Sequence, residues 1–539
     1  MPLSPKHHRL LRGHCLRYSV MLLLICCASA TPKSYASTTL FMGNSGEPGT
    51  LDPHRYNLRL EETLLNDLFM GLTTFSAEGE IIPGAAESWS VSEDGLLWRF
   101  KLRPDLLWSD GTPLTADDFV YSLRRLLDPN TAASLAYFMY MLKNAEAVNK
   151  DELPVTALGV RSADRHTLIM ELHAPYPFLP ERLLYPTAFP VPKHVIDKVG
   201  EAWTKPAHWV SNGAYTLADW QPQAYVELAQ NPNFFAPAQI QRARYLPLAN
   251  EQAAYNRYRN GELHAIASFP ASEISNAHKN YSTSLRQAPL LSMMYLVFNT
   301  RQPPFDDARV RTALASVIDQ DILTDKILRS GASAANGFTP AAINDYQHPQ
   351  TDPSGTPTQL LQRAQQLLAD AGYDTNDPLR ITLRHVSSNE VKKVNLAIAG
   401  MWRQLGVITE LQQSTMNAHF ADLRQGAFDV AWAGWIGENN AEHYLSLLAS
   451  DVGDVNYGAY QSAEFDRLIN LARNQAEIAK RNQLLHQAEA VVLRDAPVVP
   501  LYSLASRRLV NPNLRGWYDN ARDIHPLRYL RFAQDSANQ

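Results

Sequence analysis

A regular alternation of helix and strand patterns between residues 360 and 434 restricts the fold more than any other feature of this sequence. Apolar residues recur at helical spacing over 360–371 and again over 389–405, and a glycine follows each run where a helix commonly ends. Between them, 379–386 alternates apolar and polar residues as a half-buried strand does, and VITELQQ follows as the next strand. This β-α-β order predicts an α/β fold.

The segment FDVAWAG, residues 428–434, reads as a further strand that ends at Gly434. Ligands of open α/β sheets gather at the carboxyl ends of strands. Gly434 would let a ligand approach the backbone closely, Trp435 would offer an apolar wall, and Glu438 would supply charge. The alternative is a core tryptophan followed by a solvated acidic loop, and this stretch alone leaves both interpretations open.

The N-terminus differs from the rest of the chain. A basic segment precedes an apolar run over 20–30, and small residues offer cleavage sites after Ala30 or Ala36. This pattern predicts a secretory signal peptide over residues 1–36. A membrane anchor is not expected, because the run is about half the ~20 residues that a spanning helix needs. The basic residues of the segment are Lys6, Arg9, Arg12 and Arg17.

All three cysteines, Cys15, Cys26 and Cys27, lie in the predicted leader, so the mature chain would contain none. That excludes a disulfide framework, a thiolate nucleophile and a cysteine-ligated zinc site. Ile25 stands before Cys26 where a lipoprotein signal needs a small residue, so no lipid anchor is expected. Export without an anchor indicates the periplasm of a Gram-negative cell.

Length and charge limit the partners. The 539 residues predict roughly two to four domains. Loss of the leader removes five basic residues and no acidic one, which changes the formal net charge from −5 to −10. An acidic chain repels nucleic acid and anionic lipid, so we expect neither as a partner.

Signatures of enzymes are missing from the sequence. HExxH, a P-loop and a dinucleotide fingerprint do not occur, and the histidines show no metal-ligand spacing. GASAANG at 331–337 fails as a nucleophile elbow because Ala335 replaces its second glycine, and 451–464 fails the register of a calcium loop. We therefore expect no metal, no cofactor and no catalysis.

A long motif fills residues 71–129, with FKLR at 100–103, WSDG at 108–111 and TADDFVY at 115–121. Together with segments that follow in order along the chain, it resembles the extracellular solute-binding proteins that serve dipeptide and oligopeptide ABC importers, and among them the oligopeptide-binding branch. The further segments are EPGTLDPH (47–54), SNGAY (211–215), PPFDDARVRTAL (303–314), LLADAGY (367–373) and FDVAWAGW (428–435).

The motif itself has a structural explanation. Asp110-Gly111 is a turn pair after a strand, and Thr115 suits the N-cap of a helix that carries Phe119 and Leu123. We interpret the WSDG block as scaffold.

The resemblance implies an α/β, bilobal periplasmic-binding-protein (venus flytrap) fold with a third domain and a hinge. Domain I would take residues 37–73, 198–295 and 508–539, domain II, the extra domain of the family, 74–197, and domain III 296–507. The lobes would enclose the ligand by a hinge motion. The protein is expected to be a monomer.

The resemblance also implies a site. In the oligopeptide branch the peptide lies extended like an added β-strand, and main-chain hydrogen bonds supply affinity without reading sequence. One partner segment would be Ala433-Gly434-Trp435-Ile436, and the other would lie near Glu61-Glu62-Thr63. Glu438 aligns with the carboxylate that pairs with the peptide's α-ammonium, since an unpaired charge in a closed cleft costs several kcal/mol.

The chain departs from the family where a peptide carboxylate would be held. Trp432 replaces an arginine and Val391 replaces a histidine, and the sequence leaves open whether Trp432 narrows the cleft or packs outward. Ile436 and Ser292 replace two cysteines that are bridged in relatives. The residues that could hold the carboxylate instead, each of which can equally be a surface charge, are Arg424, Lys392, Lys393 and His385.

We therefore predict a periplasmic receptor that binds oligopeptides and delivers them to the permease and ATPase of an ABC importer. The first alternative is the same fold binding a murein or modified peptide for recycling or sensing, which the missing carboxylate holders favour. The second alternative is a periplasmic peptidase or amidase, for which a nucleophile or metal constellation would argue.

Overall fold

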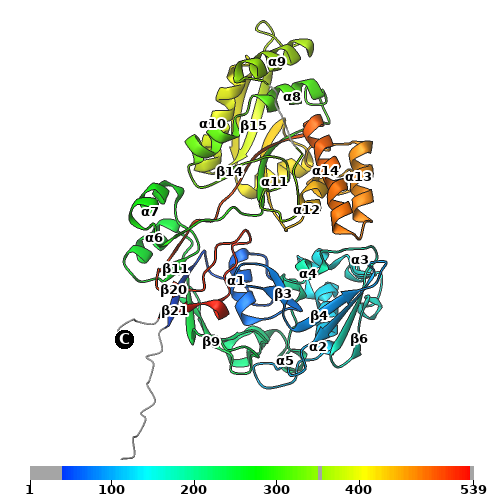
Figure 1. The fold of residues 1–539 in the computed structure, drawn as a ribbon, viewed down its shortest axis with the longest axis vertical. Coiled ribbons are helices and arrows are strands. Elements are labelled where there is room, and N and C mark those ends of the chain that lie inside the picture. The colour runs from blue at the N-terminus through cyan, green and yellow to red at the C-terminus, as the bar shows by residue number, and fades with distance from the viewer. Residues whose placement is uncertain (1–38, 350–354, 534–539) are drawn as a thin grey trace, which may run out of the picture. The chain divides into compact units, whose positions relative to one another are not determined.

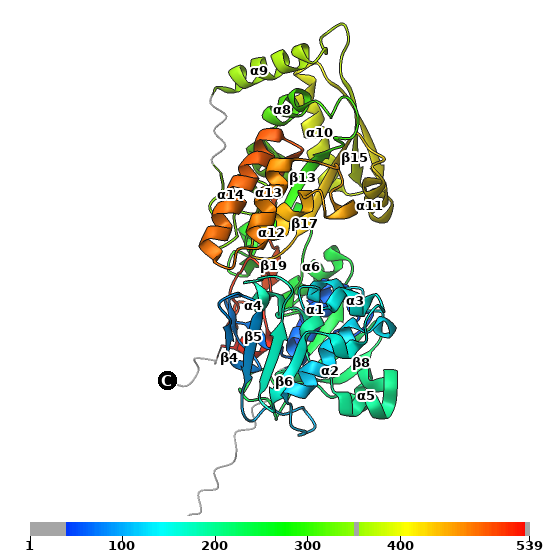
Figure 2. The ribbon, with the colours of Figure 1, turned by 90° about the vertical axis from the view of Figure 1, so that its right-hand side faces the viewer.

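The computed structural model describes residues 39–349 and 355–533, so the predicted signal peptide and its cysteines lie outside the described residues. Three larger sheets organise this part of the chain. In Figures 1 and 2, the helices α8–α14 surround the sheet that contains β13 and β15, whereas the blue and cyan elements, with the green helices α6 and α7, lie around the other two sheets. None of the helices in the described ranges is long and apolar enough to span a membrane.

The seven-stranded sheet has the order β12-β19-β11-β1-β10-β9-β8 and combines both ends of the chain. Strand β1 pairs in parallel with β10 and β11, and the remaining pairs are antiparallel. The strands are β1 (Leu40–Asn44), β8 (Tyr215–Gln221), β9 (Tyr225–Gln230), β10 (Arg242–Pro247), β11 (Ala265–Ile266), β12 (Leu285–Arg286) and β19 (Arg508–Val510). Its neighbouring helices are α1 (Arg59–Leu68), α6 (Glu251–Arg259) and α7 (Ile274–Asn280).

The four-stranded antiparallel sheet has the order β4-β5-β7-β6. It consists of β4 (Ala86–Val91), β5 (Leu97–Leu102), β6 (Val160–Asp164) and β7 (Thr167–Glu171), and is followed or interrupted by α2 (Ala116–Leu127), α3 (Ala145–Asn149), α4 (Leu179–Arg182) and α5 (Lys193–Val199). One continuous hydrophobic core joins this sheet to the seven-stranded one, since Phe100 and Phe119 pack in the same cluster as Leu64 and Tyr215. There are also two small two-stranded antiparallel sheets, β2 (Thr73–Phe75) with β3 (Ile81–Pro83) and β20 (Leu514–Arg515) with β21 (Arg531–Phe532).

The structural interpretation of the WSDG block is confirmed. Gly111 has a φ of +85°, which suits glycine, and its N–H donates to the carbonyl of Trp108 at 2.9 Å. Thr115 stands at the N-cap of α2, and its backbone N–H donates to the carboxylate of Asp118 at 2.8 Å. These contacts close a turn and begin a helix, so the motif positions scaffold elements.

The six-stranded sheet has the order β14-β18-β13-β17-β15-β16. Its strands are β13 (Ser292–Phe298), β14 (Ser333–Ala334), β15 (Arg380–Val386), β16 (Ile408–Ser414), β17 (Val430–Ile436) and β18 (Val498–Ser503). Its longer helices are α8 (Ala308–Ser316), α9 (Pro357–Asp370), α10 (Asn389–Arg403), α11 (Met416–Gln425), α13 (Ala463–Arg473) and α14 (Ile478–Asp495), with the short α12 (Glu442–Leu445). The predicted β-α-β unit is confirmed, because α10 joins β15 to its parallel neighbour β16.

Both faces of β17 are covered. Ala431 and Ala433 lie in the core that includes α13 and α14, whereas Val430 and Trp432 lie in the core that includes α8, α9 and α10. Successive side chains of a strand point to opposite faces, which explains why this strand is apolar throughout.

The three-domain division stays a prediction. Two of the predicted domains share one hydrophobic core, and the described chain from Thr39 onward lies in a single compact unit. Strand β13 begins at Ser292, so it crosses the predicted boundary between residues 295 and 296.

Candidate ligand-binding site

A cavity of about 800 Å³ lies at the carboxyl end of β17. This volume falls within the ~300–1,000 Å³ of typical small-ligand sites. Its walls are largely aromatic and aliphatic, and five charged side chains face it. The aromatic residues that line it are Phe75, Tyr137, Phe138, Tyr185 and Trp435. The charged residues are Arg59, Glu62, Arg182, Arg522 and Asp523.

The structure brings only part of the predicted site to this cavity. Gly434, Trp435, Ile436 and Glu62 line it. The other four predicted site residues do not appear in its lining, and each has a different environment. These residues are Trp432, Ala433, Glu61 and Glu438.

One edge of β17 has no strand beside it over its last residues. Strand β15 pairs only with Val430 and Ala431, so within the described residues no strand lies beside this edge from Trp432 to Ile436, and past Trp432 the edge is open. On the other edge, the N–H of Gly437 donates to Leu291 at 2.9 Å, and the paired register with β13 has no shift. Backbone groups of alternate residues face opposite edges, so the N–H and C=O of Gly434 and Ile436 point to the open edge.

The side chains near this edge contact their neighbours in the sheet as well as the cavity. A Cβ on Gly434 would lie 2.5 Å from the sulfur of Met294, so the glycine makes room for a cross-strand neighbour rather than only for a ligand. Trp435 is half-buried and lies beside His443, with ring centroids 6.0 Å apart. Ile436 is 57% exposed and stands directly opposite Ser292, the position where relatives carry the second bridged cysteine.

Trp432 does not narrow the cavity. Its side chain is 8% exposed and packs in the core between the sheet and α10, and Nε2 of His419 lies 2.7 Å from its carbonyl oxygen. The large side chain therefore serves as core, and the His419 ring closes the backbone edge at this residue.

Glu61 supports a loop. Its two carboxylate oxygens accept backbone N–H groups of Gly49 at 2.8 Å, Thr50 at 3.2 Å, Asn57 at 2.8 Å and Leu58 at 3.0 Å. Residue 61 is the third of α1, where a glutamate commonly caps the preceding backbone. With every oxygen used, Glu61 organises residues 49–58.

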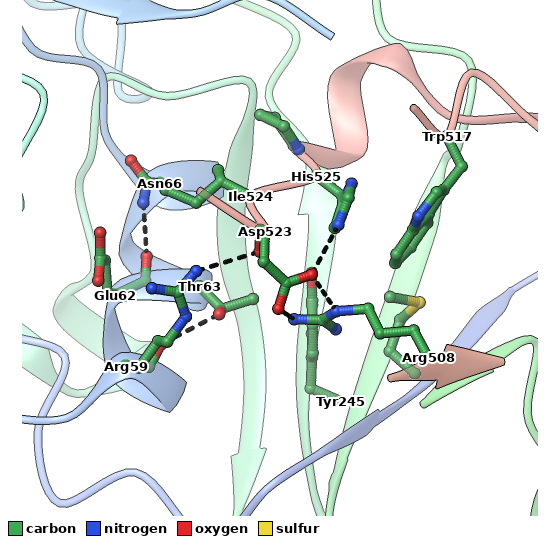
Figure 3. Close-up of a pocket in the computed structure, with 12 residues that line it drawn as sticks. Arg59, Glu62, Thr63, Asn66, Tyr245, Arg508, Trp517, Asp523, Ile524 and His525 are labelled. Atoms are coloured by element: carbon green, nitrogen blue, oxygen red, sulfur yellow. Dashed lines mark hydrogen bonds and ion pairs between the residues drawn. The ribbon is translucent and has the colours of Figure 1, made fainter. Parts of the chain in front are cut away.

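Glu62 lies on the cavity side of the same helix. Burial raises the pKa of Glu62, while the guanidiniums of Arg59 and Arg522 act against that rise. Glu62 also lines a smaller pocket of about 30 Å³, which has room for little more than one water. In Figure 3, the side chain of Asn66 donates a hydrogen bond to the backbone carbonyl of Glu62 and not to its carboxylate. Within the described ranges, no side-chain cation lies within ion-pair distance of the Glu62 carboxylate.

Glu438 is fully buried and faces a cation of the same chain. Its Oε1 lies 2.9 Å from Nη2 of Arg182, at the end of α4, and Asn440 donates to its Oε2 at 3.1 Å. The contact with Arg182 is an ion pair rather than an aligned hydrogen bond, because Oε1 accepts no hydrogen bond from the described residues. The sequence predicted a ligand ammonium at this carboxylate, and the structure has a guanidinium there.

Two further side chains complete this cluster. Nη2 of Arg182 donates to the Tyr176 hydroxyl at 3.1 Å, and that hydroxyl donates to Glu438 at 3.4 Å. Nδ1 of His443 lies 3.7 Å from Glu438, but burial and the nearby Arg182 lower the pKa of His443 to about 3. His443 is therefore neutral near pH 7, and Arg182 is the cation that balances Glu438.

A second ion pair lies beside the first. The guanidinium of Arg522 pairs with the buried carboxylate of Glu181, which also accepts the backbone N–H of Asn439 at 2.6 Å. Arg182, Glu181, Tyr176 and Arg522 were not found by reasoning from the sequence. No local spacing marks the two ion pairs, because Glu438 and Arg522 lie far along the chain from Arg182 and Glu181.

The candidate holders of a ligand carboxylate lie elsewhere. None of the four lines the cavity. Arg424 is exposed, 3.9 Å from Asp454, and Lys392 and Lys393 are exposed on α10. His385 is buried, with Nδ1 2.8 Å from the carbonyl of Val386. The guanidiniums that do reach the cavity belong to Arg59, Arg182 and Arg522.

Comparison with known proteins adds a family and a set of relatives. Residues 80–456 match the family described as bacterial extracellular solute-binding proteins, family 5 middle. The periplasmic oligopeptide-binding protein OppA of Escherichia coli is 36% identical over 487 residues, which cover 89% of this chain and 89% of OppA. The probable deoxycholate-binding periplasmic protein YgiS of the same species is 35% identical over 488 residues, which cover 88% of this chain and 89% of YgiS.

The solved structure of the periplasmic murein tripeptide-binding protein MppA, in an unliganded open form, has a TM-score of 0.83 and 32% identity. The likeness covers 93% of this chain and 98% of that one. It confirms the predicted bilobal α/β fold class. The three relatives thus bear names that refer to peptides, a bile acid and a wall peptide.

Proposed function

This chain belongs to family 5 of the bacterial extracellular solute-binding proteins, and from that premise we propose that it captures peptides in the periplasm for an ABC importer. The observation that carries the proposal is the open edge of β17 beside the cavity. Gly434 and Ile436 present two N–H and two C=O groups there, which is what an extended peptide main chain pairs with.

The cavity walls suit varied peptide side chains. Aromatic and aliphatic residues supply most of the lining. Affinity from main-chain pairing combined with a wide apolar cavity favours binding without strong sequence preference. Trp435 and Ile436 supply apolar contact next to the pairing edge, and Glu62 is the carboxylate available to a cationic side chain of the ligand.

The work assigned to the protein is capture, closure around the ligand and delivery, without chemistry. The membrane permease and its ATPase are the partners, the protein acts as a monomer, and the predicted leader directs it to the periplasm. In the described residues no three His, Asp or Glu side chains come together as metal ligands.

A modified peptide of the cell wall is a second candidate ligand. The observation that favours it is that Trp432 and Val391 are core residues, so neither supplies the carboxylate contact expected for an ordinary short peptide. The cationic groups that reach the cavity belong to Arg59, Arg182 and Arg522, which stand at other positions than Trp432 and Val391.

Thermal unfolding of the secreted chain tests the proposal. The ligands are randomised tri- to pentapeptides, a murein tripeptide and deoxycholate, each added separately. A ligand at a hundred times its dissociation constant stabilises the folded state by roughly 2.7 kcal/mol. We expect the peptides to raise the melting temperature. If deoxycholate alone raises it, peptide capture is wrong and the ligand is an amphipathic acid.

A further inference from the structure

The carboxylate of Glu438 already has a counter-ion from its own chain. Glu438 is fully buried, the side chain of Arg182 is 11% exposed, and the two charged groups lie 2.9 Å apart. Arg182 lines the cavity and Glu438 does not, so the guanidinium lies between the carboxylate and the space for a ligand. A ligand ammonium cannot reach Glu438 without moving Arg182.

Arg182 is held where it lies. Its guanidinium stacks over the ring of Phe138, 4.8 Å from the centroid, and donates to the Tyr176 hydroxyl at 3.1 Å. The pKa of Arg182 is raised overall, because the effects of Tyr176 and Glu438 outweigh the lowering by burial. The residue therefore stays charged. An ammonium brought beside it would meet a like charge in a poorly solvated place.

The two other acids of the cavity, Asp523 and Glu62, differ from Glu438. Asp523 pairs with Arg508 at 2.6 Å and lies 3.1 Å from His525 (Figure 3). Glu62 has no cation at ion-pair distance in the described part of the chain, and burial raises its pKa, which disfavours its charged form. The cavity thus offers no carboxylate with the burial and fixed geometry of Glu438 to a ligand ammonium.

We infer that Arg182 takes the place of the ligand's α-ammonium, so that the site accepts peptides whose N-terminus is blocked or uncharged. This inference rests on the proposed function and specifies the ligand class of the same site. Main-chain pairing along β17 supplies the affinity, and the buried Arg182–Glu438 pair removes the requirement for a free amine that an unpaired carboxylate would impose.

A competition between matched peptides tests the inference. A randomised tetrapeptide pool, half of it N-acetylated, is incubated with the secreted chain, and unbound peptide is removed by gel filtration. The retained acetylated and free peptides are then quantified by mass spectrometry. We expect the acetylated forms to be retained at least as well as the free forms, because the ammonium of a free form would meet the charge of Arg182. The variant Arg182→Met exposes Glu438 to the cavity, and it should enrich free peptides at least ~tenfold.

The double variant Arg182→Met/Glu438→Gln is the matched control, because it has neither charge and should show no enrichment. If the native chain enriches free peptides by ~tenfold, the inference is wrong while peptide capture stands. If the native chain retains neither form, peptide capture fails and the inference fails with it. Should Arg182→Met not fold, the retention ratio of the native chain decides.

Discussion

Nη2 of Arg182 lies 2.9 Å from Oε1 of Glu438, and this contact joins α4 to the loop that follows β17. Both groups are buried, so removal of one leaves the other uncompensated. We expect Arg182→Met to lower the free energy of unfolding by ~3–5 kcal/mol, and Arg182→Met/Glu438→Gln to recover most of that loss. Urea unfolding followed by tryptophan fluorescence measures both.

The control for this pair is Lys193→Met, which breaks an exposed ion pair with Asp197 and should change stability by less than ~1 kcal/mol. A single variant Arg182→Met that is as stable as the native chain would mean that Glu438 finds another partner or is not charged.

The open edge of β17 is tested at Ile436. Ile436→Pro removes the N–H that faces the open edge, whereas Ile436→Ala keeps it and shortens only an exposed side chain. We expect the proline variant to weaken peptide binding at least ~tenfold, the loss of about 1.4 kcal/mol, and the alanine variant to bind nearly as the native chain does. Titration calorimetry with a retained peptide measures this. Equal loss in both variants would assign the effect to the side chain instead.

Local patterns predicted the fold well and the site poorly. The unit of β15, α10 and β16 follows from helical and alternating periodicity, which depend on neighbours in the chain. The role of Glu61 was within reach, because a glutamate at the third position of a helix commonly caps the backbone before it. The direction of Trp432 was not, since alternation separates the two faces of β17 without saying which packs on α10. The pairing of Arg182 with Glu438 depends on two distant segments meeting, which no spacing reports.

Trp432 gives a prediction that separates alignment from structure. Trp432→Arg restores the residue that oligopeptide-binding relatives carry, but the side chain would enter the core beside α10. We expect this variant to destabilise the protein by several kcal/mol. The preference for peptides with a free C-terminus over C-amidated peptides should stay unchanged. Trp432→Phe is the control and should cost less. A gain in preference for the free carboxylate would show that residue 432 reaches the ligand.

A buried histidine makes the stability depend on pH. His54 is 1% exposed, its Nδ1 lies 2.8 Å from Nη1 of Arg125, and burial, with Arg125, lowers the pKa of His54 to about 3. The nitrogen that faces Arg125 must accept, so the folded state holds the neutral ring. The unfolded chain binds a proton below about pH 6.5 and the folded one does not until about pH 3, so stability falls as the pH falls through this window.

His54→Gln tests that dependence, because an amide can accept from Arg125 and donate to the carbonyl of Phe189 as the neutral ring does. Between pH 7 and pH 4, we expect the free energy of unfolding of the variant to fall less than that of the native chain, by up to ~3 kcal/mol. Urea unfolding at the two pH values measures this. The exposed His208→Gln is the control and should keep the native slope. If the stability of His54→Gln depends on pH as the native chain's does, other groups cause the loss of stability in acid. The nearest of these is the Asp52 carboxylate beside Arg125.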